Sequence, residues 1–195
     1  GVGASEGVHD EGLGETDDLM AVIAAAQADP SAPADAPVLL AGFSFGGFVQ
    51  SRVAQRLASE GRPPKGLVLI APAVNMTQRL MWDRFSQHAR DQLAQNGLIY
   101  DPSEYDPEGY PITQALIEDG RQHLLLGQAI DLAIPVRILH GQRDDAVPWQ
   151  LSLELAEALS GDDVELHFIK NGDHRLSSDA HLKTLISLIE ELLSQ

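Results

Sequence analysis

The feature that most constrains this chain is an apolar run that ends in Gly-x-Ser-x-Gly. The run from Val38 to Ala41 leads into Gly42-Phe43-Ser44-Phe45-Gly46, and an amphipathic stretch follows. A strand that turns sharply into a helix holds a serine in a strained backbone conformation and lifts its hydroxyl above the sheet. Bulky neighbours would clash in such a turn, so we expect Gly42 and Gly46 to be required by close packing around Ser44. A plain Gly/Ser-rich loop is the alternative for this stretch alone.

Composition limits the classes of protein and of chemistry. The chain has 195 residues, of which 44% are hydrophobic, and a formal net charge of -16. These values predict one globular domain, and no apolar run is long enough to span a bilayer. The negative charge argues against nucleic acid and anionic membranes as partners and promotes solubility. No cysteine is present, which excludes disulfides, a thiolate nucleophile and thiolate metal sites. No signal peptide is recognisable, and we expect a cytoplasmic protein.

The remainder of the sequence alternates between apolar strands and amphipathic helices. Strands are expected at 38–41, 66–70, 136–140 and 164–169, and helices at about 16–26, 46–60, 148–160 and 182–193. Continuous apolar strands separated by helices are typical of a buried parallel sheet, so the expected fold class is α/β. In such a sheet the loops that follow the strands lie at the carboxyl edge, where ligands bind.

Residues 75–133 interrupt this alternation. They contain no clear strand, but a helix is expected at 113–125. Their large apolar and aromatic side chains are Met76, Leu80, Met81, Trp82, Phe85, Tyr100, Tyr105 and Tyr110. We interpret the segment as a small helical cap inserted into a single domain of residues 1–195. Packing of these side chains onto the sheet is the simpler alternative.

Two later loops supply the partners that a serine nucleophile needs. A serine hydroxyl requires a base to take its proton and an acid to orient that base. The loop after residues 136–140 carries Asp144 and Asp145, and the loop after residues 164–169 carries His174. The chain order is therefore serine, acid, histidine, and each follows a strand of the expected sheet. Asp144 is preferred as the acid because it directly ends the Gly-x-x-Asp turn, with Asp145 as the fallback.

Histidine usage favours His174 as the base. It is one of seven histidines, and it alone follows the final strand in a short polar loop. The other six have simpler explanations. His9 lies in the leading loop, and His88 and His123 lie in the expected cap. His140 ends a strand, where packing or loop hydrogen bonding suffices, His167 lies within a strand, and His181 begins the last helix. A metal site at Asp173 and His174 would lack a spaced ligand pair, so no metal is expected. The backbone N–H of Phe45 is the expected oxyanion donor, and no strand before Ser44 supplies a second donor.

These segments resemble the α/β-hydrolase-fold serine esterases. The resemblance is carried by Gly42–Gly47, His140–Trp149 and Asn171–Ser177, most specifically by Asp-His-Arg and Asp-Asp-x-Val-Pro-Trp. Within that family the chain looks like bacterial relatives of the mitochondrial acyl-glucuronide esterase that is also described as a protein S-depalmitoylase. Three further segments look like the cap of that branch: Pro102–Tyr105, Tyr110–Thr113 and His123–Leu126.

The resemblance covers nearly the whole chain and implies an α/β-hydrolase fold without a cofactor. It implies Ser44 as nucleophile, Asp144 as acid and His174 as base, with an ester or thioester of an apolar acyl group as the small-molecule substrate. Substrate contacts are expected from Phe43, Met81, Trp82 and Val147.

The sequence departs from the family at its front. Family members have further strands before the loop that resembles Gly1–Gly7, and those strands bring an oxyanion loop. We therefore expect a fragment of a longer protein or a shortened form, in which an uncovered sheet edge favours a homodimer.

A hydrolase-like binding protein without catalysis is the alternative function. Dehalogenases and epoxide hydrolases use an aspartate nucleophile and dienelactone-hydrolase types use cysteine, so neither fits Ser44.

Overall fold

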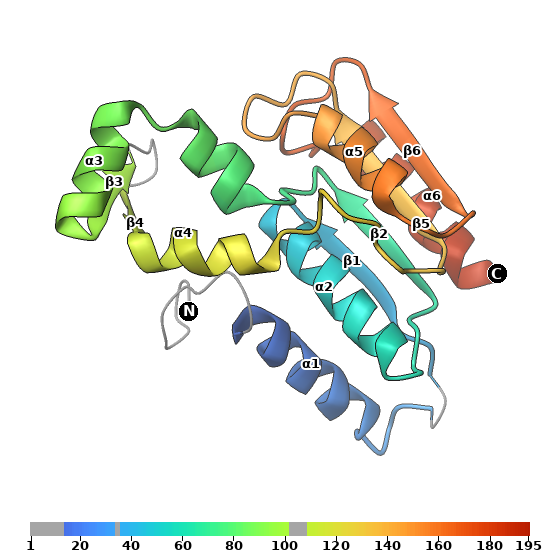
Figure 1. Cartoon of the computed structure of the whole chain (residues 1–195). Helices are drawn as coiled ribbons and strands as arrows, with labels where there is room; N and C mark the ends of the chain where they lie inside the picture. The colour runs from blue at the N-terminus through green and yellow to red at the C-terminus, as the bar shows by residue number, and fades with distance from the viewer. Residues whose placement is uncertain (1–13, 34–35, 102–108) are drawn as a thin grey trace. The chain divides into compact units, whose positions relative to one another are not determined.

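The computed structural model describes residues 14–33, 36–101 and 109–195 (Figure 1). These residues form two compact units. The insert unit holds residues 14–15, 75–101 and 109–124, and the sheet unit holds residues 16–33, 36–74 and 125–195. The single-domain organisation with a cap at 75–133 stays a prediction.

The sheet unit is built on a four-stranded parallel sheet in the order β1-β2-β5-β6. The strands are β1 (Leu39–Phe43), β2 (Gly66–Ile70), β5 (Val136–Gly141) and β6 (Val164–Ile169). All residues of β2 and β5 are buried, as expected for central strands covered on both faces. The expectation of a parallel sheet is confirmed, and the predicted strand ends differ from the observed ones by at most two residues.

Four helices belong wholly or mainly to this unit: α1 (Gly14–Gln27), α2 (Phe45–Ser59), α5 (Gln150–Ala158) and α6 (Asp179–Ser194). Helix α2 packs against β1 and β2 and buries Phe48, Val53 and Leu57. Helix α6 covers the opposite face, where Leu188 and Leu192 join a core cluster with residues of β2 and β5 (Figure 1). The sheet is thus held between two helical layers, which leaves its carboxyl edge to the loops.

A buried guanidinium ties α6 to the sheet. Arg137 of β5 is 2% exposed. It donates to Glu191 of α6 at 2.6 Å and to Asp163 at 2.6 Å, and lies 3.7 Å from Glu165 of β6. A buried cation is tolerated only when its donors are satisfied, and here acidic side chains from the rim of the unit satisfy them.

The insert unit combines short helices with a hairpin. It contains a π-helical turn (Met76–Met81), a 3-10 turn (Trp82–Arg84), α3 (Gln87–Asn96), α4 (Gln114–Gly120) and a 3-10 turn at Arg121–His123. Strands β3 (Leu98–Asp101) and β4 (Tyr110–Thr113) pair antiparallel. Its core is the cluster of Leu93, Ile112, Leu116 and Ile117, with Met81, Trp82, Phe85 and Ile99 packed around it.

The expectation that this segment lacks strands is wrong. Strands β3 and β4 have four residues each, and Pro111 lies within β4. Short runs and an internal proline both weaken the sequence signal for a strand, so the hairpin leaves little trace in the pattern. The expected helix at 113–125 is shorter than predicted, because α4 ends at Gly120 and a 3-10 turn follows.

In the described ranges, none of the helices has both the length and the apolar composition that crossing a bilayer requires.

Replacement of Arg137 by Met tests the buried cation. We expect the Arg137→Met variant to unfold with a free energy about 1–3 kcal/mol lower, because three carboxylates lose a shared donor. The matched control is Arg56→Met, since the pair that Arg56 forms with Asp17 is solvent-exposed and worth little. Urea denaturation followed by circular dichroism measures both. Equal effects of the two substitutions would contradict a special role for Arg137.

Candidate active site

Ser44 sits between β1 and α2 in a conformation that non-glycine residues rarely adopt. Its φ is 53° and its ψ is -122°. Neighbouring backbone holds this strain: the Ser44 N–H donates to the Ile70 carbonyl at 2.8 Å, and its carbonyl accepts from the N–H groups of Gly47 at 2.9 Å and Ala73 at 3.0 Å. Strained backbone that is fixed on several sides is a frequent property of functional sites. The serine hydroxyl is thereby presented at the carboxyl edge of the sheet.

The glycines around Ser44 have different roles. A Cβ atom on Gly42 would lie 2.4 Å from the Gly46 carbonyl oxygen, so this position requires glycine. A Cβ atom on Gly46 would meet nothing within 4 Å, and the expectation that Gly46 avoids a clash is wrong. The second tight approach belongs instead to Gly47, whose added Cβ would lie 3.0 Å from Pro72. Close neighbours therefore surround Gly42 and Gly47, whereas Gly46 faces open space.

Asp144 lies in the loop after β5, and its side chain has no solvent exposure. Its Oδ1 accepts from the N–H groups of Ala146 at 2.9 Å and Val147 at 2.7 Å. Its Oδ2 lies 2.7 Å from His174 Nδ1 and 3.1 Å from His140 Nε2. A carboxylate with both oxygens engaged in this way cannot rotate freely.

The environment of Asp144 keeps it ionised. Burial acts to raise its pKa, but hydrogen bonds from His140, His174 and the Val147 N–H outweigh burial. The pKa of Asp144 therefore lies well below its ordinary value. A carboxylate that stays charged is an acceptor only, so the Nδ1 atom of His174 carries the proton between them.

His174 lies in the loop after β6 and bridges the other two residues. While Nδ1 contacts Asp144, Nε2 lies 3.2 Å from Ser44 Oγ. The loop is anchored by Leu176, which is 3% exposed and belongs to the core cluster under α6. Because Nδ1 carries the proton, Nε2 has a lone pair directed to the serine hydroxyl. The arrangement can take a proton from Ser44.

Backbone hydrogen bonds also connect the loop after β5, which carries Asp144 (the acid loop), with the loop after β6, which carries His174 (the base loop). The N–H of Arg143 donates to the Gly172 carbonyl at 2.9 Å, and the N–H of Gln142 donates to the Ile169 carbonyl at 2.9 Å. A Cβ on Gly141 would lie 2.3 Å from the Gly172 carbonyl oxygen. Glycine at the end of β5 therefore lets the two loops touch.

The other site residues expected in the sheet unit differ in their exposure and contacts. Phe43 is 44% exposed, and its ring centroid is 4.9 Å from that of His174. Phe45 begins α2, so its N–H lies at the positive end of the helix dipole. Asp145 is exposed, in contrast to Asp144. Val147 is 2% exposed, and its backbone N–H supports the Asp144 carboxylate.

Met81 and Trp82 belong to the insert unit. Both pack on its core cluster, and the Trp82 ring has the guanidinium carbons of Arg90 and Arg121 at 5.1 Å and 4.5 Å from its centroid. These contacts give both residues a packing role within the unit. Their expected contact with a substrate stays a prediction.

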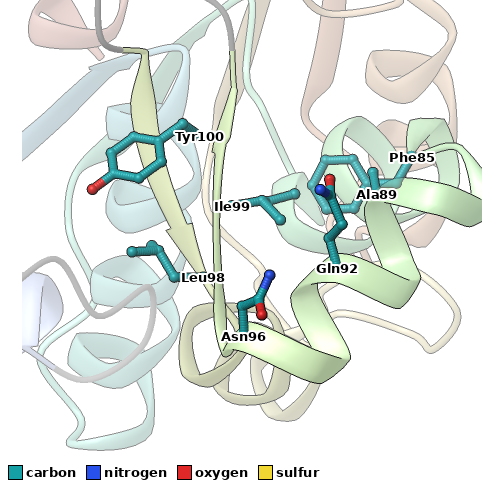
Figure 2. A pocket seen from close by; sticks show the side chains of 7 residues that line it. All are labelled: Phe85, Ala89, Gln92, Asn96, Leu98, Ile99 and Tyr100. Carbon is teal, nitrogen blue, oxygen red and sulfur yellow. The ribbon is translucent and has the colours of Figure 1, made fainter.

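The insert unit also contains a cavity of about 310 Å³ between α3 and β3. Figure 2 shows Ile99 pointing from β3 toward Phe85 and Gln92. The lining residues are Phe85, Ala89, Gln92, Asn96, Leu98, Ile99 and Tyr100. This lining has no carboxylate, imidazole or serine hydroxyl, so it offers no acid–base chemistry near neutral pH.

His140 and Ser152, which lie next to the acid loop, were not expected to belong to the site. His140 is 0% exposed, and its Nδ1 lies 2.7 Å from Ser152 Oγ of α5. His140 was expected to serve in packing or loop hydrogen bonding, and its hydrogen bonds reach Asp144 itself. Its spacing of four residues from Asp144 is the only available signal, and nothing in the sequence points to Ser152.

Within the described residues, no group of three or more His, Asp or Glu side chains could hold a metal ion. The segment Gly1–Gly7 and the cap segment at residues 102–105 lie outside the described residues. The second oxyanion donor that the family resemblance attributes to the front of the fold is therefore not assigned to any residue.

Comparison with known proteins shows what the chain is similar to. A protein-family model described as Thioesterase domain matches residues 4–193. Palmitoyl-protein thioesterase ABHD10, mitochondrial, from Homo sapiens is 30% identical over 199 residues, covering 100% of this chain and 61% of that protein. A putative hydrolase from Agrobacterium vitis S4 has a TM-score of 0.86 and 34% identity over 97% of this chain and 72% of that chain. The mouse alpha/beta hydrolase domain-containing protein 10 has a TM-score of 0.79 and 30% identity, over 100% of this chain and 74% of that chain.

These similarities confirm the α/β-hydrolase fold class and the expected resemblance. The chain spans 52% and 61% of the length of the bovine and human relatives. The expectation of a cytoplasmic protein is wrong, because these relatives are named as mitochondrial proteins. That expectation rested on composition and on the absence of a recognisable signal peptide, and neither separates the two compartments.

Substitution of the two glycines that flank Ser44 tests how the turn is packed. We expect Gly42→Ala to lower the free energy of unfolding by about 1–3 kcal/mol or more, because its Cβ would overlap the Gly46 carbonyl. Gly46→Ala, the matched control, should leave stability nearly unchanged because its Cβ enters open space. Thermal denaturation of the two variants measures the difference. Similar destabilisation by both would contradict the asymmetric crowding.

Proposed function

Because the chain belongs to the thioesterase domain family, we propose that it is a serine hydrolase that cleaves thioesters or carboxylic esters of an apolar acyl group. The observation that carries the proposal is the contact chain from Ser44 Oγ to His174 to Asp144, with distances of 3.2 Å and 2.7 Å. A hydroxyl, an imidazole and an ionised carboxylate in this order are the components of nucleophilic catalysis by serine.

The first half of the reaction forms an acyl-enzyme on Ser44. His174 Nε2 takes the hydroxyl proton as Ser44 Oγ attacks the acyl carbon, and Asp144 stabilises the imidazolium that results. The negative charge moves to the acyl oxygen, where the N–H of Phe45 at the start of α2 can donate to it. When the tetrahedral intermediate collapses, the bond to the thiol or alcohol breaks and His174 returns the proton to that leaving group.

Water completes the cycle by the same steps in reverse order. His174 removes a proton from water as the water oxygen attacks the acyl carbon, and then returns a proton to Ser44 Oγ. The products are a carboxylic acid and a free enzyme. No redox step or cofactor is needed for this balance.

Two observations support an apolar acyl group. The phenyl ring of Phe43 lies beside His174 and remains 44% exposed, which gives the nucleophile an apolar neighbour. The relative from Homo sapiens is named a palmitoyl-protein thioesterase, and palmitate is a long apolar acyl chain. We therefore favour thioesters and esters with a long acyl chain over short, polar acyl groups.

Covalent labelling with a fluorophosphonate tests Ser44 without a guess about substrate. We expect one adduct per chain by intact mass, and none in Ser44→Ala, because only an activated serine reacts with such probes. The matched control is Ser59→Ala, which removes a hydroxyl that only donates to the Arg56 carbonyl. It should label like the unsubstituted chain.

An adduct that persists in Ser44→Ala would contradict the assignment. Failure of the unsubstituted chain to label, together with saturable binding of an acyl thioether analogue, would favour the alternative of a hydrolase-like binding protein.

A pair of substitutions distinguishes the two aspartates. We expect Asp144→Asn to lower the labelling rate by about 10³–10⁴-fold, because an amide favours the wrong histidine tautomer. Asp145→Asn, its matched control, should label at the original rate because Asp145 is exposed. A stopped time course at pH 7.5 measures both rates. The reverse outcome would move the role of acid to Asp145.

A further inference from the structure

The Asp144 carboxylate has a second histidine neighbour that the reaction described above does not use. His140 Nε2 lies 3.1 Å from Asp144 Oδ2, the same oxygen that contacts His174. The His140 ring is completely buried, so its hydrogen bonds are made to protein groups in a site that excludes water.

The partners of His140 determine where its proton is. Nε2 faces two acceptors, Asp144 Oδ2 and the Val147 carbonyl, each at 3.1 Å. An unprotonated Nε2 would place a lone pair against two other acceptors, so Nε2 carries the proton and donates to both. Nδ1 is then the acceptor, and it receives the Ser152 hydroxyl at 2.7 Å. A ring with one proton is therefore the Nε2–H tautomer, and its contact with Ser152 ties its orientation to α5.

We propose that His140, held by Ser152, is a positioning residue that fixes the Asp144 carboxylate for catalysis by Ser44 and His174. This inference rests on the proposed serine hydrolase function. The chain of contacts runs from Ser152 through His140 and Asp144 to His174 and Ser44. It links helix α5 to the nucleophile through side chains of the sheet unit alone.

The physical effect is on the orientation of Asp144. The N–H groups of Ala146 and Val147 hold Oδ1, whereas the His140 and His174 rings contact Oδ2. Without the His140 donor, His174 would be the remaining partner of Oδ2 among the described residues, and the carboxyl plane could tilt as His174 moves between its neutral and charged forms. A fixed carboxylate keeps His174 Nε2 aimed at Ser44 Oγ throughout the cycle.

Three variants separate positioning from simple core packing. His140→Phe keeps the ring shape without a donor, and His140→Gln supplies an N–H and an acceptor oxygen without the ring. His167→Phe is the matched control, because His167 lies on the neighbouring strand β6 and its Nε2 is 3.1 Å from Glu165 Oε2. Circular dichroism and thermal denaturation show whether each variant is folded.

We expect His140→Phe to lower kcat by about 10–100-fold for a 4-nitrophenyl ester with little change in KM, because His140 does not touch the substrate. His140→Gln should recover most of that loss, and His167→Phe should behave like the unsubstituted chain. Should His140→Phe fail to fold, Ser152→Ala takes its place and should lower kcat less strongly. Unchanged kcat in a folded His140→Phe variant would overturn the inference.

A double substitution tests whether His140 acts through Asp144. In the Asp144→Asn background, His140→Phe should cause no further loss of fluorophosphonate labelling rate, since the group that it positions has been replaced. Multiplicative losses would show that His140 acts by another route and would overturn the inference.

Nitrogen-15 NMR of the histidine rings gives a readout besides activity. We expect His140, assigned by its loss in His140→Gln, to show a protonated Nε2 and an unprotonated Nδ1. A proton on Nδ1 would overturn the inference even in an active enzyme. Failure of the unsubstituted chain to react with fluorophosphonate would instead overturn the proposed function, and the two failures are therefore distinguishable.

Discussion

A buried carboxylate at the end of β5 is the interaction on which the geometry of the site depends. Placing an ionised side chain out of water is costly unless several donors satisfy it. Asp144 meets this condition with two backbone N–H groups on one oxygen and two imidazole nitrogens on the other. The donors come from the loop of Asp144 itself, from β5 and from the loop after β6, so the ionised state of Asp144 and the arrangement of the loops support each other.

The parallel sheet explains why these parts meet. Because β1, β2, β5 and β6 all run in the same direction, the turn at Ser44 and the loops of Asp144 and His174 lie at one edge. Residues separated by 130 positions in the chain thus come within hydrogen-bonding distance, as Ser44 and His174 do. Backbone bonds across the edge, such as that from Arg143 to Gly172, then hold the loops in register.

The sequence predicted those features that depend on neighbouring residues in the chain. Continuous apolar runs predicted the strands of the sheet, and the turn after β1 was recognisable from Gly42 and Ser44 because sterics demand small residues there. The position of His174 in a loop after the last strand identified it as a candidate base. Distances between these residues depend on the tertiary fold, and only the structure provides them.

Other features left no local signal. The tight contact at Gly47 depends on Pro72 in the segment after β2, which the turn sequence does not contain. Strand β4 has four residues and contains Pro111, so its sequence pattern does not indicate a strand. The role of Ser152 depends on the tertiary fold, which brings α5 next to His140, so no periodicity could have revealed it.

The central claim is that acyl transfer passes through Ser44, and the most direct measurement is the location of the acyl group during turnover. The chain would be mixed with a palmitoyl thioester, quenched in acid during the steady state, digested and examined by tandem mass spectrometry. We predict a palmitoyl ester on Ser44 that disappears when the substrate is exhausted. Thioester hydrolysis without an acyl group on Ser44, or hydrolysis at an unchanged rate by Ser44→Ala, would contradict the claim.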